Sequence, residues 1–164
     1  VKTIKVPGGG GNFTCLKDGS KCYVGLRKAN AVGVIDMAKL ELMKTIETGP
    51  DANRLYLNPG NSRYGLFANE AGKSDIVSII DTQLDVKVKD IWTGLGPHNV
   101  AFDPDGKFAV ISTKKENVAT LVDTGSADPN DWDVITTDLD SGIQNNGVRW
   151  VPSPAALKKA LAQN

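Results

Sequence analysis

The chain has few of the residues that mark a catalytic or cofactor-binding protein. Among its 164 residues there is one histidine, there are two cysteines, and only 6% are aromatic. Nineteen basic residues balance nineteen acidic ones, so the net charge gives no support for a nucleic-acid or anionic-membrane partner. No apolar run approaches the roughly 20 residues that would span a bilayer, and we expect no membrane span.

Familiar catalytic and cofactor motifs are also missing from the sequence. There is no CxxCH motif, which excludes covalent c-type haem on this chain. We find no P-loop, no GxSxG, no zinc HExxH and no EF-hand pattern. The stretch DPNDWD offers carboxylates to a calcium ion, although its spacing is not that of an EF-hand loop. No cofactor is therefore identified by a motif.

The overall composition is that of a folded domain. The hydrophobic fraction is 40% and the charged fraction 23%, which is typical of one globular domain. The sequence starts at Val1, inside the strand-like stretch VKTIKV, with neither a Met nor a signal-peptide pattern. We therefore expect a chain that is processed, excised or truncated at its start.

The two cysteines, Cys15 and Cys22, stand on either side of a turn signal in FTCLKDGSKCYV. Asp18-Gly19 is a strong two-residue hairpin turn. With these residues in the turn, Cys15 lies directly opposite Cys22, within reach of a disulfide. The alternative is a pair of buried thiols that act as small hydrophobic side chains. A disulfide would favour an extracytoplasmic location.

Three sequence landmarks recur along the chain at intervals of about 45 residues. The first is a strand-like segment that ends in Asp, at Asp36, Asp81 and Asp123. The second is a following segment that ends in Gly, at Gly49, Gly94 and Gly142. The third joins an Asn to a turn Gly seven residues later, in the pairs Asn12 and Gly19, Asn53 and Gly60, and Asn99 and Gly106. A fourth copy of this landmark begins at NNGVRWVPSP, with Asn145 or Asn146 in the Asn position.

Each repeat divides into four short segments that are rich in β-branched and aromatic residues and are separated by turn formers. Four strands at this period are typical of β-propeller blades. We therefore predict an all-β fold for residues 1–152, an incomplete β-propeller of four-stranded antiparallel blades. About three full blades are expected, over residues 7–49, 50–95 and 96–142. VKTIKV matches the fourth strand of a preceding blade, and GVRWVP matches the first strand of a following one.

Residues 153–164 are predicted to form a short C-terminal helix. Ser153 is a good N-cap and Pro154 fits the first helical position. Apolar side chains at the helical spacing form a stripe that suits docking onto a blade or a partner.

Several of these motifs resemble the YVTN-type β-propeller repeats of bacterial and archaeal surface and periplasmic proteins. The resemblance rests on the corners VIDMAK and IIDTQL, on the strands KTIETGP and DIWTGLGP, and on VAFDPDGK. It covers nearly the whole chain to about residue 152, but GGGGNF departs from the later Gly-Pro pattern. Related blades occur in the propellers of nitrous oxide reductase, haem-d nitrite reductase and quinoprotein amine dehydrogenases. The resemblance implies a periplasmic or extracellular propeller and is weak for function, because one scaffold hosts many activities.

Three blades and two loose strands do not close a ring of four to eight blades. An open ring would leave apolar sheet faces exposed. Other propeller blades from the same or another chain would complete it, or the chain would self-associate, or the fold would be an unusually small closed one. We expect that the chain does not persist as an isolated monomer.

In a propeller the first strand of each blade lines the central channel, and ligands usually bind at its mouth. This places the following polar candidates there: His98, Asn12, Asn53, Asn99, Asn146, Arg54 and Arg149. His98 is either a metal ligand or general base, or a polar residue that caps the start of its strand. The recurring Asn and Asp residues favour structural roles, because such side chains bond to nearby backbone groups.

Resemblance to the nitrous oxide reductase group implies copper bound by histidines from several blades. Here the positions equivalent to His98 hold Gly11, Ala52 and Asn145, so such a site would need ligands from other segments. Trp132, in the loop SADPNDWD, is expected to be an exposed candidate contact for a partner, while Trp150 is expected on an inner strand.

The sequence therefore predicts an extracytoplasmic β-propeller that acts as a binding or scaffold module. One alternative is part of a periplasmic oxidoreductase, similar to nitrous oxide reductase or amine dehydrogenase, whose metal or haem ligands come largely from other segments. A second alternative is a surface-layer adhesion module.

Overall fold

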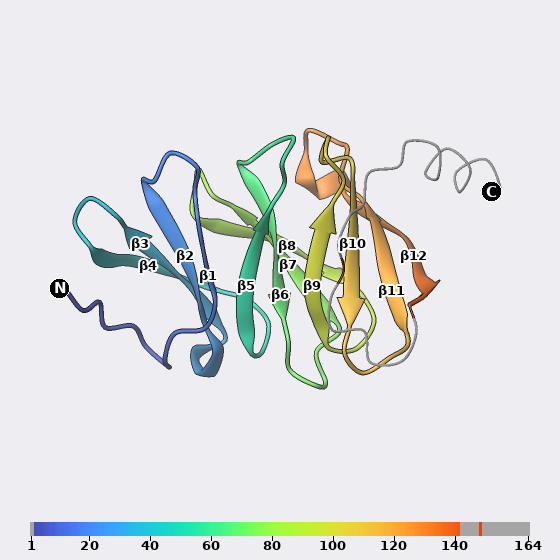
Figure 1. The fold of residues 1–164 in the computed structure, drawn as a ribbon, viewed down its shortest axis with the longest axis horizontal. Coiled ribbons are helices and arrows are strands. Elements are labelled where there is room, and N and C mark those ends of the chain that lie inside the picture. The colour runs from blue at the N-terminus through green and yellow to red at the C-terminus, as the bar shows by residue number, and fades with distance from the viewer. Residues whose placement is uncertain (1, 142–147, 149–164) are drawn as a thin grey trace.

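Three four-stranded antiparallel sheets stand side by side in the computed structural model, which describes residues 2–141 and residue 148 (Figure 1). The first sheet holds β1 (Phe13–Cys15), β2 (Lys21–Leu26), β3 (Ala31–Asp36) and β4 (Glu41–Glu47). The second holds β5 (Ala52–Leu57), β6 (Tyr64–Asn69), β7 (Ile76–Asp81) and β8 (Val86–Trp92). The third holds β9 (Pro97–Phe102), β10 (Phe108–Thr113), β11 (Val118–Asp123) and β12 (Asp133–Asp140). The predicted fold class, all-β with four-stranded antiparallel blades, is confirmed.

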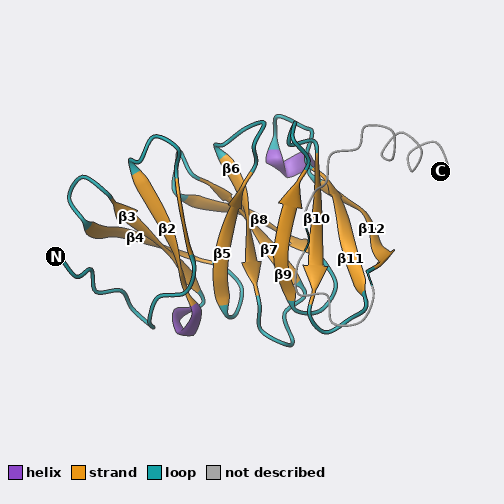
Figure 2. Ribbon diagram, viewed as in Figure 1, coloured by secondary structure: helices purple, strands orange, loops and turns teal. Residues whose placement is uncertain are grey.

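Helical structure in the described part of the chain is limited to two 3-10 turns, η1 (Arg27–Ala29) and η2 (Pro129–Asp131) (Figure 2). The predicted strand GVRWVP, which contains Arg149 and Trp150, lies outside the described residues. So do Asn146 and the predicted helix over residues 153–164. Residues 2–6 were predicted as a strand but form none, because no described strand runs beside them to share backbone hydrogen bonds.

The blades pack face to face through side chains that alternate along their strands. Between the first and second sheets the buried cluster contains Tyr23, Val32, Val34, Ile46, Ala52, Leu55, Phe67 and Ile80. Between the second and third sheets it contains Tyr64, Leu66, Val77, Ile79, Ile91, Val100, Ala109, Ile111, Val122 and Trp132. The second sheet is therefore covered on both faces, and all six residues of β6 are buried.

The recurring Asp at the end of each third strand fixes the turn that follows, as predicted. Asp36 Oδ1 accepts hydrogen bonds from the backbone N–H groups of Ala38 and Lys39, both at 2.9 Å. Asp81 Oδ1 does the same for the next turn, at 2.8 and 3.0 Å, and Asp123 Oδ1 accepts from Gly125 N at 2.9 Å. One carboxylate per blade thus accepts hydrogen bonds from turn N–H groups that have no backbone acceptor.

Asp81 also binds a cation. The Arg63 Nη2 and Nε atoms donate to Asp81 Oδ2 at 2.7 and 2.9 Å. Burial alone would raise the pKa of the Asp81 carboxyl, but the bonds from Arg63 and from two backbone N–H groups outweigh burial and lower this pKa. The carboxylate is therefore stabilised in its charged form.

The first hairpin differs from the predicted one in its turn. Gly19 N–H donates to the Leu16 carbonyl at 3.0 Å, and Gly19 has φ of 70°. Lys17 and Asp18 are therefore the central residues, because Gly19 takes the left-handed conformation after them. Cys15 still lies opposite Cys22, and a disulfide joins the two.

Candidate functional site

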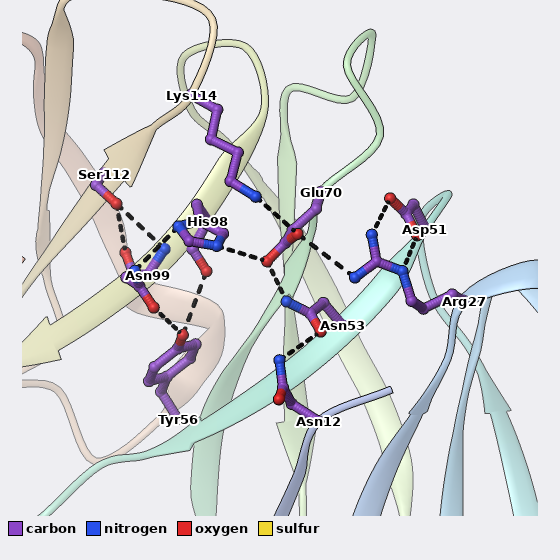
Figure 3. A network of polar contacts seen from close by, with 10 residues as sticks. All are labelled: Asn12, Arg27, Asp51, Asn53, Tyr56, Glu70, His98, Asn99, Ser112 and Lys114. Atoms are coloured by element: carbon purple, nitrogen blue, oxygen red, sulfur yellow. Dashed lines mark hydrogen bonds and ion pairs between the residues drawn. The ribbon is translucent and has the colours of Figure 1, made fainter. Parts of the chain in front are cut away.

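A group of polar side chains gathers at the edge where the first strand of each blade begins and the second strand ends. Asn12 lies directly before β1, and Asn53 and Asn99 lie within the first three residues of β5 and β9. The first residue after β2, β6 and β10 is charged: Arg27, Glu70 and Lys114. Because neighbouring strands are antiparallel, both sets lie at one edge, and Figure 3 shows them converging on Glu70.

Glu70 is the centre of this polar cluster, and only 3% of its side chain is exposed. Its Oε1 atom accepts hydrogen bonds from Asn53 Nδ2 and from His98 Nε2, the latter at 3.1 Å. Its Oε2 atom lies 3.1 Å from Lys114 Nζ and 3.6 Å from Arg27 Nη1. A buried carboxylate is costly unless it is paired and hydrogen-bonded, and here cations from the two flanking blades supply that pairing.

His98 is held in one tautomer by its neighbours. The Tyr56 hydroxyl donates to Asn99 Oδ1 at 2.6 Å, so the Asn99 amide presents its Nδ2 hydrogens to His98 Nδ1, 3.0 Å away. His98 Nδ1 is then the acceptor, and Nε2 carries the hydrogen that points to Glu70. Burial raises the pKa of the Tyr56 phenol, which keeps it a donor.

The hydrogen bonds around His98 bear on its predicted metal role. Both ring nitrogens contact protein groups, so a metal ion at either nitrogen would displace Asn99 or Glu70. Within residues 2–141 and at residue 148, no group of three or more His, Cys, Asp and Glu side chains is placed to hold a metal ion. The geometry suits His98 as a link between the second and third blades.

The remaining predicted residues join the cluster to different degrees. Asn12 Nδ2 donates to Asn53 Oδ1 at 2.9 Å, which ties the first blade to the second. Arg54 points elsewhere: its guanidinium lies over the Tyr56 ring, 5.2 Å from the centroid. Arg54 and Tyr56 line a pocket of about 320 Å³ along the inner strands, together with Thr14, Val100 and Phe102.

Sequence reasoning found the Asn residues but missed Glu70, Arg27 and Lys114. Their signal was present, because each is the first residue after the second strand of its blade. Comparing this position across the repeats shows a basic, an acidic and a basic residue in order. Arg27 also pairs with Asp51, with Nε 2.7 Å from Oδ1. This ion pair is another contact between the first and second blades.

The prediction for Trp132 was wrong. Its side chain is only 1% exposed and packs edge-on against Tyr64, with ring centroids 5.9 Å apart. The loop folds back on itself: Trp132 Nε1 donates to the Ser126 carbonyl at 2.9 Å. Trp92, at the end of β8, is the exposed tryptophan of the described residues, at 68%.

The described part of the chain contains no helix that is long and apolar enough to cross a membrane. The sequence matches no protein-family model and no curated protein. Similarity therefore comes from solved structures. Together with the three stacked sheets, it defines the class: consecutive blades of a β-propeller.

Three solved structures illustrate the similarity. Hydrazine synthase of Kuenenia stuttgartiensis is 25% identical with a TM-score of 0.61, over 74% of this chain and 36% of that one. The dihydro-heme d1 dehydrogenase NirN, in complex with DHE, is 20% identical with a TM-score of 0.67, over 84% and 31%. A functionally unknown protein from Desulfotomaculum acetoxidans is 19% identical with a TM-score of 0.66, over 89% and 46%. The chain spans less than half the length of each.

Proposed function

We propose that the chain contributes three blades to an extracytoplasmic β-propeller, where it acts as a binding or scaffold module and is completed by further blades. The observation that carries this proposal is an exposed apolar side chain, Phe13, on the outer face of the first sheet. On this face, Val24, Leu26 and Ala31 form a small buried cluster. Phe13 on β1 lies opposite Val24 on β2, but its side chain is 67% exposed. No described blade covers this face, and exposed apolar sheet favours association.

The polar cluster around Glu70 supports a scaffold role for these residues. Its side chains bond mainly to each other and join three blades in sequence. The Cys15–Cys22 disulfide supports the extracytoplasmic location, because such bonds persist in oxidising compartments. A ligand would then bind at the rim of the channel mouth, on a framework that these contacts hold fixed.

The mass of the native assembly tests this proposal. Native mass spectrometry or multi-angle light scattering should give a particle heavier than the 17.4 kDa of the chain. A stable 17.4 kDa monomer in the native material, across the micromolar range, would overturn the proposal.

A second candidate is part of a periplasmic oxidoreductase, with metal or haem ligands supplied largely by other segments. The similarity to hydrazine synthase and to a dihydro-heme d1 dehydrogenase favours it. A visible absorption spectrum and metal analysis of the native assembly separate the two candidates. Colour or bound metal, altered by His98→Ala, would support the oxidoreductase; a colourless and metal-free assembly would exclude it.

A further inference from the structure

Residues 2–6 repeat the sequence of a fourth strand without forming one. They read KTIKV, and residues 44–48, in and just after β4, read KTIET. The burial pattern of the two segments also matches. Ile4 and Val6 are partly buried, while Lys2, Thr3 and Lys5 are exposed. Ile4 thus corresponds to Ile46 and, in the second blade, to Ile91, which are 6% and 4% exposed in the cores between blades.

The contacts of this segment place it on the outer face of the first sheet. Val6 packs against the cluster of Val24, Leu26 and Ala31. At its other end, Lys2 Nζ donates to the Lys39 carbonyl at 2.7 Å, in the turn between β3 and β4. The segment therefore crosses the face that a preceding blade would cover.

Close glycine contacts after the fourth strands give further support for this placement. A Cβ on Gly49 would lie 2.8 Å from Asn69 Cγ, and one on Gly94 would lie 2.9 Å from Thr113 Cγ2. Each glycine therefore lies in close contact with the next blade, at the end of the second strand of that next blade. Gly8 also approaches the first blade closely, although at a different place: a Cβ on it would lie 2.8 Å from Ala29 N, in η1, which directly follows β2.

We propose that residues 2–6 are the fourth strand of a further blade and that their partner is a three-stranded antiparallel sheet lacking its own fourth strand. The unpaired edge of residues 2–6 would pair antiparallel with the third strand of that sheet, a case of β-strand addition. In the two complete examples the residue opposite the buried Ile is Val32 or Val77. The partner strand therefore presents a β-branched apolar residue opposite Ile4. This inference rests on the proposed function, and it adds which edge of the chain the neighbouring blade engages.

Hydrogen exchange of the backbone amides tests the pairing directly. Peptides covering residues 2–6 are compared between the native assembly and the isolated wild-type chain. Ladder hydrogen bonds should slow their exchange at least about 100-fold in the assembly. Ile4→Lys should weaken assembly at least about tenfold, because a charge replaces a core side chain. Lys5→Glu is the matched control: Lys5 corresponds to the exposed Glu47, so assembly should be unchanged.

The outcomes separate the two proposals. An assembly in which residues 2–6 exchange as fast as in the isolated chain overturns this inference and leaves the proposed function standing. Equal effects of Ile4→Lys and Lys5→Glu also count against it. A monomeric native protein overturns the proposed function, and this inference with it.

Discussion

Glu70 shows how one residue ties neighbouring blades together. Its oxygens receive donors from the first, second and third blades, and two of the donors are cations. Removing the carboxylate would leave Asn53 and His98 without their acceptor and would bring Arg27 and Lys114 together without an anion between them. The cost of such a change comes from the groups left behind.

Glu70→Ala should lower the free energy of unfolding by about 3 kcal/mol, the low end for breaking a buried ion pair, because Arg27 and Lys114 keep access to water. Glu41→Ala, on exposed β4, is the control and should change it by less than about 0.5 kcal/mol. Urea unfolding followed by tryptophan fluorescence measures both. Equal losses would show that Glu70 does not hold the blades together.

Asp81 should make stability depend on pH in the acid range. Its folded pKa is lowered, so its contribution is fully present above the unfolded value of about 3.9 and is lost as pH falls through the folded pKa below that value. We expect wild type to exceed Asp81→Asn in Tm at pH 5 to 7, with the difference shrinking below about pH 4. Thermal unfolding between pH 7 and pH 2.5 checks this; a constant difference would contradict it.

At the scale of elements, the close approach of β2 to β5 fixes how the first two blades dock. A Cβ on Gly25 would overlap the backbone carbonyl oxygens of Asn53 and Ala52. Backbone atoms of the neighbouring strand have little freedom to move aside, unlike the end of a long side chain. The glycine in β2 is therefore required by the spacing between blades.

Gly25→Ala should lower the free energy of unfolding by about 3 kcal/mol, the upper range for overpacking a rigid contact. Gly10→Ala is the control, because its nearest neighbour would be Val24 Cγ2 at 3.7 Å, and it should change stability by less than about 0.5 kcal/mol. Chemical denaturation compares the two. A tolerated Gly25→Ala would mean that the blades separate more easily than their packing suggests.

The elements themselves were readable from the sequence because a repeat shows each pattern several times. The Asp corners and the alternation of apolar residues mark strand ends locally, and both depend on contacts within a few residues. The environment of Trp132 was not readable, since its burial depends on Tyr64 in another blade. The position of Glu70 could be found by comparing the repeats, but its role could not, because its donors come from segments up to 44 residues away.

At the scale of the whole molecule, stability should decrease from the middle blade outward. The second sheet has an apolar core on each face, whereas the outer face of the first sheet has only a small cluster. In stacked repeats, each unit gains stability from the neighbours that it contacts. The middle blade contacts two described blades, and each outer blade contacts one.

Native-state hydrogen exchange on the isolated chain should follow this order. Amides of β6 and β7 should exchange slowest, close to the global unfolding limit, because their side chains are almost all buried and they open only when both cores separate. Amides of β1, a three-residue strand with Phe13 and Cys15 exposed, should exchange at least about tenfold faster through local opening. Equal protection of β1 and β6 would mean that the three blades open as one unit. In that case the contacts through Glu70 and Asn12, rather than the apolar cores, would set the cooperativity of the molecule.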